Sequence, residues 1–161
     1  MHTQFQTDPN ARPKPKTVLV IEEERFTLLT LWLMIKNAGY RVVSAGDGAE
    51  ALKAIRLERP ALILADVNQD SGGASREWDA FKLMDWMKYQ YPEHRTECII
   101  VSAGDPEKIR HRATEAGAFG FVAKPITKSL LLAEIKRAIG DPCDASRHGE
   151  TTFFRRHIPL E

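Results

Sequence analysis

Short apolar runs and longer mixed segments alternate through most of the chain. The five apolar runs are rich in Val, Ile, Leu and Ala, which predicts strands, and the segments between them have the length and spacing of amphipathic helices. The predicted strands lie at 18–21, 41–44, 61–65, 99–101 and 120–122, and the predicted helices lie at about 25–38, 47–58, 77–90, 106–116 and 127–139.

Several predicted strands are apolar at consecutive positions, which is typical of a parallel sheet covered by helices on both faces. Because crossovers between parallel strands are right-handed, only a few topologies of the strands and helices remain. We expect a doubly wound α/β fold with a five-stranded parallel sheet of the (βα)5 type. Asp47, with Glu50 three residues later, is typical of a helix start, and Gly39 and Gly117 are typical of helix ends.

The length and composition predict one domain between two tails. Of 161 residues, 43% are hydrophobic and 28% are charged, which is enough apolar content for one buried core. Residues 1–16 are polar and contain three prolines, so we expect a flexible N-terminal tail there. The predicted domain covers residues 17–140, and a C-terminal tail of mixed character covers residues 141–161.

The charge balance argues against nucleic-acid and membrane partners. The 23 basic residues nearly balance 22 acidic ones, so the net charge of +1 creates no field that attracts nucleic acid or anionic lipid. There is no signal-peptide core, and the densest apolar stretch, 26–35, is too short to span a bilayer. Cys98 and Cys143 lack metal-site spacing, and Cys98 is expected to be a buried free thiol. We expect a cytoplasmic protein.

Polar residues follow four of the five predicted strands. Glu22 and Glu23 come after the first strand, Asp66 after the third, Ser102 after the fourth and Lys124 after the fifth. Since ligands of such sheets bind at the carboxyl ends of the strands, we expect these side chains to converge. Three neighbouring carboxylates repel one another unless a cation neutralises them, and a site of oxygen ligands suits Mg²⁺.

The same residues suggest phosphoryl chemistry. Asp66 ends a buried run, so its carboxylate is a candidate nucleophile towards phosphorus. Lys124 and Ser102 would supply a cation and a hydroxyl to the phosphoryl oxygens. Each residue alone has a plainer interpretation, as a helix cap, an acidic first turn or a solvated charge, and it is the ordered set that favours a site.

This ordered set resembles the receiver domain of bacterial two-component response regulators, in particular the chemotaxis-regulator-like receivers with a flavodoxin-like fold. The resemblance covers roughly residues 17–140 and rests on the acidic pair, the lone Asp66, Ser102-Ala103 and Lys124-Pro125. Further agreement comes from Gly39-Tyr40, the stretch 45–52 and Gly117-Ala118.

The resemblance implies a phosphoacceptor rather than an enzyme. Asp66 would accept a phosphoryl group from a histidine kinase or phosphotransfer protein, and Lys124 would pair with the phosphoryl oxygens. The implied ligands of Mg²⁺ are Glu22, Glu23, Asp66 and the carbonyl of Asn68.

The resemblance also implies a switch pair, Ser102 and Phe121, and a cis Lys124-Pro125 bond. The phosphoryl group would draw the Ser102 hydroxyl towards it and let Phe121 turn inward, which changes the surface seen by a downstream protein. With about twenty residues beyond the predicted domain, we expect output through a partner or another part of a longer protein.

Two features depart from the family pattern. Glu23 stands where the family usually has Asp, and its extra methylene predicts weakened Mg²⁺ affinity. The loop 69–78 is longer than usual, and we hypothesise that Asp70 reaches back to supply the missing charge, which unchanged Mg²⁺ affinity in Asp70→Ala would refute.

The first predicted helix carries more apolar residues than one buried stripe needs. Three interpretations stay open for this surplus: a contact with a kinase or a second copy of the chain, cover by a C-terminal segment containing Phe153-Phe154, or scattered exposed residues. The surplus residues are Leu28, Leu29, Trp32 and Leu33.

Two rival functions follow from the same residues. A phosphatase of the haloacid-dehalogenase type needs a second Asp two residues after its nucleophile, and Asn68 occupies that place. The stronger rival is an atypical receiver-like interaction module that is not phosphorylated, which Glu23 and the altered loop after Asp66 favour.

Overall fold

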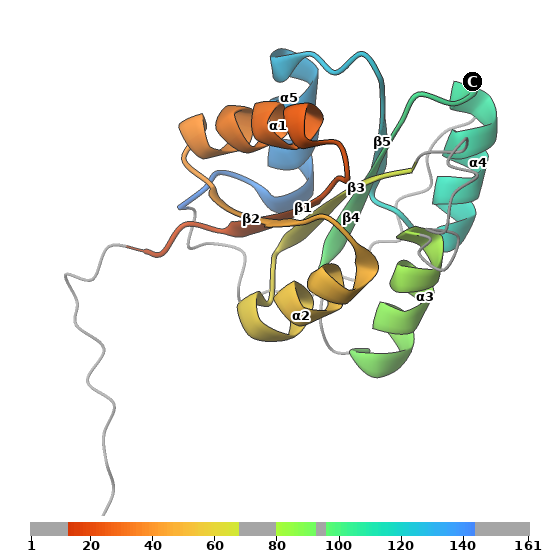
Figure 1. The fold of residues 1–161 in the computed structure, drawn as a ribbon, viewed down its shortest axis with the longest axis horizontal. Coiled ribbons are helices and arrows are strands. Elements are labelled where there is room, and N and C mark those ends of the chain that lie inside the picture. Colours follow the sequence, from red (N-terminus) through yellow and green to blue (C-terminus); the bar gives the residue numbers. More distant parts are fainter. Residues whose placement is uncertain (1–12, 68–79, 93–95, 144–161) are drawn as a thin grey trace, which may run out of the picture.

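Five strands and five helices alternate along the chain, as predicted. The computed structural model describes residues 13–67, 80–92 and 96–143 (Figure 1). The strands are β1 Thr17–Ile21, β2 Arg41–Ala45, β3 Leu62–Asp66, β4 Glu97–Ser102 and β5 Gly120–Ala123. The helices are α1 Arg25–Asn37, α2 Gly48–Glu58, α3 Ala80–Gln90, α4 Pro106–Ala116 and α5 Lys128–Ile139.

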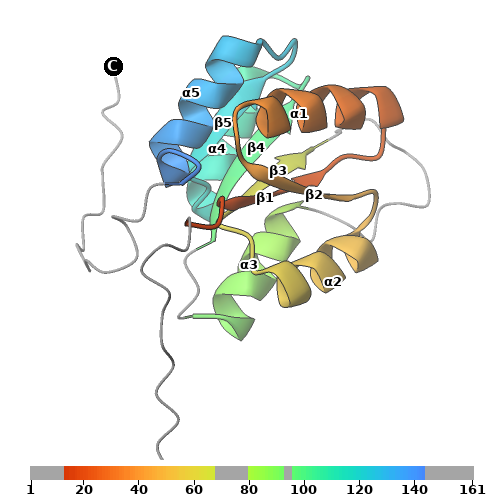
Figure 2. The same ribbon diagram turned by 90° about the vertical axis from the view of Figure 1, so that its left-hand side faces the viewer.

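The strands form one parallel sheet in the order β2-β1-β3-β4-β5. Helices α1 and α5 cover one face of this sheet, and α2, α3 and α4 cover the other (Figures 1 and 2). The expected doubly wound (βα)5 fold is therefore confirmed. Each predicted strand and helix differs from the observed one by a few residues at most, and residues 77–79 of the third predicted helix lie outside the described part.

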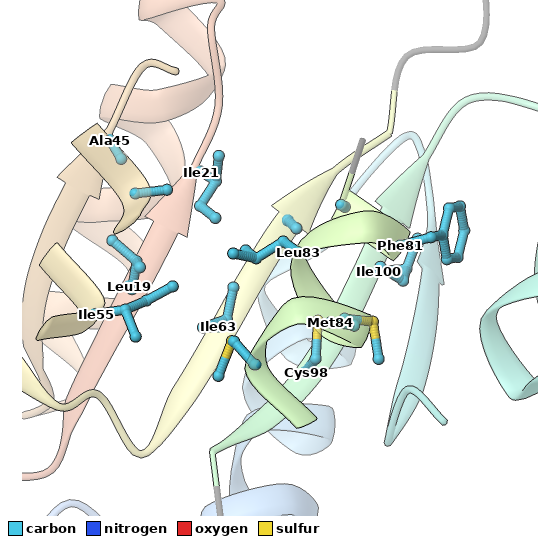
Figure 3. Packing of buried hydrophobic residues seen from close by; sticks show 14 of the residues in the cluster. Leu19, Ile21, Ala45, Ile55, Ile63, Phe81, Leu83, Met84, Cys98 and Ile100 are labelled. Atoms are coloured by element: carbon cyan, nitrogen blue, oxygen red, sulfur yellow. The ribbon is translucent and has the colours of Figure 1, made fainter. Parts of the chain in front are cut away.

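The core consists of two apolar layers, one on each face of the sheet. Alternate residues of each strand enter opposite layers, so Leu19 packs with α2 while Val18 and Val20 pack below α1 and α5. In the first layer, Ile63 and Ile100 face the helix that carries Met84 (Figure 3). Since both faces are buried, the middle positions of the inner strands are apolar, which explains the runs without alternation.

Local signals set the helix ends. The Asp47 side chain accepts a 2.8 Å hydrogen bond from the Glu50 N–H and caps α2, and the Glu50 carboxylate accepts the Gly46 N–H at 2.8 Å. Gly39 and Gly117 follow α1 and α4 with φ of 96° and 79°, a conformation that side chains disfavour. These capping predictions are confirmed.

The ends of the described domain are tied together. The Lys16 N–H donates to the Pro142 carbonyl at 2.8 Å, although the two residues belong to the predicted tails. Most of those tails, residues 1–12 and 144–161, lies outside the described part, as does the loop 69–78 that contains Asp70. Cys98 is buried and free as predicted, and Cys143 is exposed and free. No helix among the described residues is long and apolar enough to cross a membrane.

Candidate functional site

The register of the strands brings the predicted polar residues to one edge of the sheet. Ile21 of β1 pairs with Ala65 of β3, so the residues that follow, Glu22 and Asp66, leave the two strands side by side. On the other side, Ser102 of β4 pairs with Ala123 of β5, directly before Lys124.

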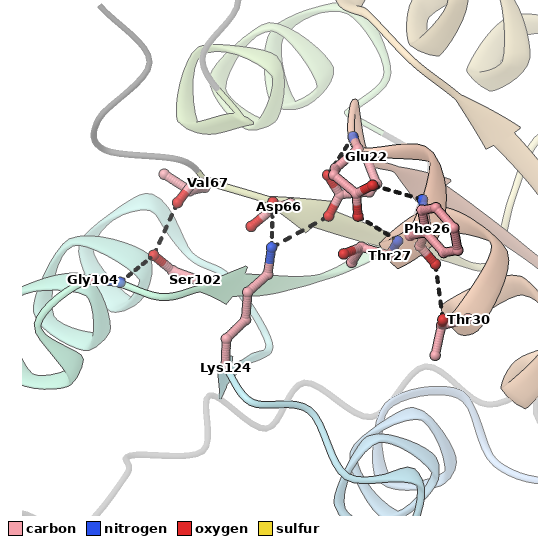
Figure 4. Close-up of polar contacts among 10 residues, drawn as sticks. Glu22, Phe26, Thr27, Thr30, Asp66, Val67, Ser102, Gly104 and Lys124 are labelled. Carbon is pink, nitrogen blue, oxygen red and sulfur yellow. Dashed lines mark hydrogen bonds and ion pairs between the residues drawn. The ribbon is translucent and has the colours of Figure 1, made fainter.

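A lysine joins two of the three predicted carboxylates. The Lys124 ammonium lies 2.7 Å from Asp66 Oδ2 and 3.4 Å from Glu22 Oε2 (Figure 4). The backbone N–H of Lys124 donates to the Ser102 carbonyl at 2.9 Å, which fixes the base of the lysine against β4. Because the Asp66 and Glu22 side chains are almost completely buried, the ammonium is their main counter-charge within the described residues.

The turn before α1 holds the Glu22 carboxylate through a backbone hydrogen bond. The Glu24 N–H donates to Glu22 Oε1 at 2.9 Å, and the Glu24 side chain caps α1 by accepting the N–H groups of Phe26 and Thr27 at 2.8 and 2.6 Å. This turn points the Glu22 carboxylate inward and leaves Glu23 and Glu24 exposed.

The electrostatics of the site follow from burial and close charges. Burial is the largest influence on the pKa of Glu22 and raises it. The Glu24 N–H lowers this pKa, the nearby Asp66 carboxylate raises it, and Lys124 lowers it least, so the pKa lies above its ordinary value. For Lys124, burial lowers the pKa, but the ion pairs with Asp66 and then Glu22 outweigh it, so its pKa is raised above the ordinary value. One ammonium faces two carboxylates, so the ionised cluster favours a further cation.

Asp66 retains one oxygen for a further partner. Its Oδ1 is buried and has no hydrogen-bond partner among the described residues, whereas Oδ2 is bound by Lys124. A buried carboxylate oxygen without a hydrogen-bond partner destabilises the fold unless an ion, water or ligand binds it. Together with the adjacent Glu22, it is suited to Mg²⁺, which typically uses one or two carboxylates and completes its shell with water and phosphate.

The predicted metal set is brought together only in part. Glu22 and Asp66 meet, Glu23 is exposed, and Asn68 lies outside the described residues. Within residues 13–67, 80–92 and 96–143, no three His, Cys, Asp or Glu side chains gather closely enough to hold a metal ion.

The two predicted switch residues lie on neighbouring strands. The fully buried Ser102 hydroxyl donates to the Val67 carbonyl at 2.9 Å and accepts the Gly104 N–H at 3.1 Å. Phe121 is half-buried against the layer that contains α4, and it lines a hollow of about 240 Å³ between α4, β5 and α5. The Lys124-Pro125 bond is cis, as expected.

The family model described as the response regulator receiver domain matches residues 18–136. The chain belongs to this family. Its receiver is 29% identical over 131 residues to the polar-differentiation response regulator DivK of Brucella anthropi, covering 79% of this chain and 98% of DivK. It is 27% identical to the transcriptional regulatory protein GlrR of Escherichia coli, covering 83% of this chain but only 28% of GlrR.

A solved receiver structure has the same fold as this chain. The signal receiver domain of a signal transduction histidine kinase from Syntrophus aciditrophicus has a TM-score of 0.67 and 25% identity, with 88% of this chain and 99% of that chain covered. Similar receivers therefore occur both as nearly whole proteins and as parts of longer ones. The relatives do not show which of these applies to this chain.

The surplus apolar residues of the receiver's α1 do not form one uniform surface. Leu29 and Leu33 are exposed by 55% and 44%, whereas Leu28 and Trp32 are half-buried. Leu28 packs beside the core, and the Lys36 ammonium lies 4.2 Å from the centre of the Trp32 ring. Phe26, which was not among the predicted surface residues, is exposed by 82%.

Two contributors to the site were missed from the sequence. Glu24 was not among the predicted site residues, yet it caps α1 and positions Glu22 through its N–H. The sequence signal was weak because Glu is not a preferred N-cap residue. Val67 contributes a backbone carbonyl to Ser102, and a backbone group leaves no trace in the residue type.

Proposed function

We propose that this receiver accepts a phosphoryl group on Asp66 and transmits the change to a protein partner. The observation that carries the proposal is the buried Asp66 carboxylate, which is paired on Oδ2 with Lys124 at 2.7 Å and is free of hydrogen-bond partners among the described residues on Oδ1. A purely structural ion pair gains nothing from leaving one buried oxygen unsatisfied.

In the proposed reaction, an Asp66 oxygen attacks the phosphorus of a phosphohistidine. The bond from phosphorus to the aspartate oxygen forms as the bond to the donor's imidazole nitrogen breaks, and the electron pair leaves with the imidazole. Lys124 would stay with the carboxylate and compensate the charge spreading over the phosphoryl oxygens, which is why a group with a raised pKa suits this place.

Mg²⁺ belongs to this proposal as the cation that neutralises the acidic cluster. Glu22 and Asp66 would hold it, with Asn68 supplying a carbonyl and Glu23 turning in from its exposed position. When bound, the ion would neutralise the negative charge of the transferred group. The placement of Glu23 supports the expectation of weakened affinity, because its longer side chain begins outside the cluster.

The proposed switch starts at the Ser102 hydroxyl. Its hydrogen bond to the Val67 carbonyl must break before the hydroxyl can turn towards a phosphoryl group on Asp66. That movement would vacate space beside β5 and let Phe121 turn inward, changing the hollow between α4, β5 and α5. A downstream protein that prefers one arrangement would then register the signal.

The proposed partners are a histidine kinase or phosphotransfer protein, a downstream effector and, in one version, a second copy of the chain. The exposed Leu29 and Leu33 on α1, beside the site, support a contact with the phosphodonor. The relatives are named as response regulators or regulatory proteins, which supports a role in two-component signalling. A cytoplasmic location is part of the same proposal.

A second candidate function is a receiver that binds partners without being phosphorylated. The exposed Glu23, which leaves only two of the predicted carboxylates in the cluster, favours it. Under this function, Lys124 alone balances the two acids, and Mg²⁺ has no required place.

Incubation of the full chain with acetyl phosphate and Mg²⁺, followed by intact-mass measurement, separates the two functions. The phosphoacceptor gains the mass of one phosphoryl group, and its melting temperature rises with Mg²⁺. The interaction module shows neither change.

A further inference from the structure

An apolar stripe on α1 is left uncovered by the rest of the domain. Phe26, Leu29 and Leu33, here called the α1 stripe, are exposed by 82%, 55% and 44%. Their spacing of three and four residues places them on one side of the helix, opposite the buried Leu31 and Ile35. They are three of the six large hydrophobic side chains exposed in the described part of the chain, so exposed apolar surface is concentrated there.

The chain itself supplies an apolar segment that begins beside α1. The Pro142 ring lies next to Gly39, where an added Cβ would be 3.3 Å from its Cγ, and the Tyr40 hydroxyl donates to the Gly140 carbonyl at 2.6 Å. The C-terminal segment, residues 144–161, therefore leaves the domain at the C-terminal end of α1. It contains Phe153, Phe154, Ile158 and Leu160, with Arg155 and Arg156 between them.

We propose that the C-terminal segment docks along α1, with Phe153 and Phe154 on the α1 stripe. The inference concerns the chain's own segment rather than an outside protein, because that segment combines apolar residues with a starting point beside the helix they would cover.

The distances fit. With a helix rise of 1.5 Å per residue, Leu33 and Leu29 lie about 9 and 15 Å along α1 from Gly39. The ten residues from Cys143 to Phe153 span at most about 33 Å when extended, and about 17 Å as a random coil. Both lengths let Phe153 reach the stripe. The tether also keeps the segment at an effective concentration on the order of millimolar, so a weak apolar contact suffices.

The charges fit the same direction. A segment running from the C-terminal end of α1 towards its N-terminal end approaches the exposed Glu23 and Glu24, which outnumber the neighbouring basic residue Arg25. Arg155 and Arg156 follow Phe153 and Phe154 directly, so the basic pair arrives at the acidic end of the helix. The opposite docking direction would bring this pair to the end that carries Lys36, where like charges repel.

Such docking would regulate the site described above, and this consequence rests on the proposed phosphoacceptor function. A phosphodonor protein that uses the α1 stripe to approach Asp66 would have to displace the C-terminal segment first. The segment would therefore slow transfer from a protein donor but leave transfer from a small donor unchanged, because a small donor needs no apolar contact.

A spin label tests the docking without any phosphorylation. The label is attached at Thr152→Cys in a Cys143→Ser background of the full chain, since Cys98 is buried and its pKa is raised to about 12 by burial. In ¹⁵N-labelled protein, the amides of Leu29 and Leu33 should lose most of their intensity, while that of Leu57, exposed on the opposite face, keeps its own. Adding Phe153→Ser and Phe154→Ser should restore the lost signals.

Two results would overturn the proposal. One is full intensity at Leu29 and Leu33 in the labelled chain. The other is broadening that also appears when spin-labelled ¹⁴N protein is mixed with unlabelled ¹⁵N protein, because the segment would then dock on a second copy. Unchanged chemical shifts in β1 and β3 show that the variants keep the fold. Because no phosphoryl group is involved, a failure of the acetyl phosphate experiment would leave this result unaffected.

Discussion

Lys124 bridges Asp66 and Glu22 at the carboxyl ends of the strands. Its ammonium lies 2.7 Å from the Asp66 carboxylate and 3.4 Å from the Glu22 carboxylate. The three residues come from the ends of β5, β3 and β1, so the bridge links strands that are not all neighbours in the sheet. One lysine therefore balances two buried acids.

Removing the lysine charge should destabilise the domain. In Lys124→Met, two buried carboxylates lose their cation, and we expect a loss of about 1–3 kcal/mol at neutral pH, reduced from the value for a fully buried pair because the lysine side chain is 23% exposed. Urea unfolding at pH 7 measures it. The loss should shrink towards acid pH, because Glu22, whose pKa is raised, becomes protonated and no longer needs a cation. Lys108→Met on α4 serves as the control. If Lys124→Met unfolds with the same free energy as wild type at pH 7, the bridge does not stabilise the domain.

The raised pKa of Glu22 predicts a definite pH dependence. Since its folded pKa lies above the ordinary value of 4.5, this group contributes stability that is fully present below pH 4.5 and is lost as the pH rises through the folded value. Glu22→Gln removes that loss. Without Mg²⁺, the melting temperature of the variant relative to wild type should therefore rise between pH 4.5 and 7.

The matched control is Glu107→Gln, whose side chain is exposed in the first turn of α4. Its melting temperature should follow that of wild type across the same range. A constant difference between Glu22→Gln and wild type would mean that burial does not raise the pKa of Glu22.

Shortening Glu23 should strengthen the metal site. Glu23→Asp restores the residue type expected at this position of a receiver and removes one methylene, which lets the carboxylate sit closer to Glu22 and Asp66. Thermal melts over a series of Mg²⁺ concentrations should show a larger stabilisation in Glu23→Asp than in wild type, because ligand binding stabilises the folded state in proportion to the logarithm of ligand over Kd. Asp66→Ala should abolish the effect. If the melting temperatures of wild type and Glu23→Asp rise equally with Mg²⁺ concentration, Glu23 takes no part in binding the ion.

Two leucines on α1 should differ sharply in their contribution to stability. In a Phe153→Ser, Phe154→Ser background, which leaves the α1 stripe uncovered, Leu31→Ala removes a side chain that is 2% exposed and should cost about 2–5 kcal/mol. In the same background, Leu29→Ala removes a side chain that is 55% exposed and should cost less than about 0.5 kcal/mol. Denaturant unfolding of the two variants checks this. Similar losses in both would indicate that Leu29 is covered in the folded chain.

The fold was predictable because its causes are local and repeated. Consecutive apolar residues in 18–21 and 61–65 predict strands buried on both faces, and Asp47 caps a helix through its own side chain. The convergence of Asp66, Ser102 and Lys124 followed from the general rule for parallel sheets.

The finer parts of the site depend on tertiary packing. Leu28 and Trp32 have the same residue character as Leu29 and Leu33, and only the packing of α1 beside the core determines that the first two are half-buried. Which acid of the pair turns inward was also not visible in the sequence, because the turn made by the Glu24 N–H orients Glu22.

Intact-mass measurement after incubation with acetyl phosphate and Mg²⁺ decides whether Asp66 accepts a phosphoryl group. Wild type and the control Asp85→Asn, which changes an exposed aspartate of α3, should each gain the mass of one phosphoryl group. Asp66→Asn should gain none. No mass gain in wild type, or an equal gain in Asp66→Asn, would show that Asp66 is not the phosphoacceptor.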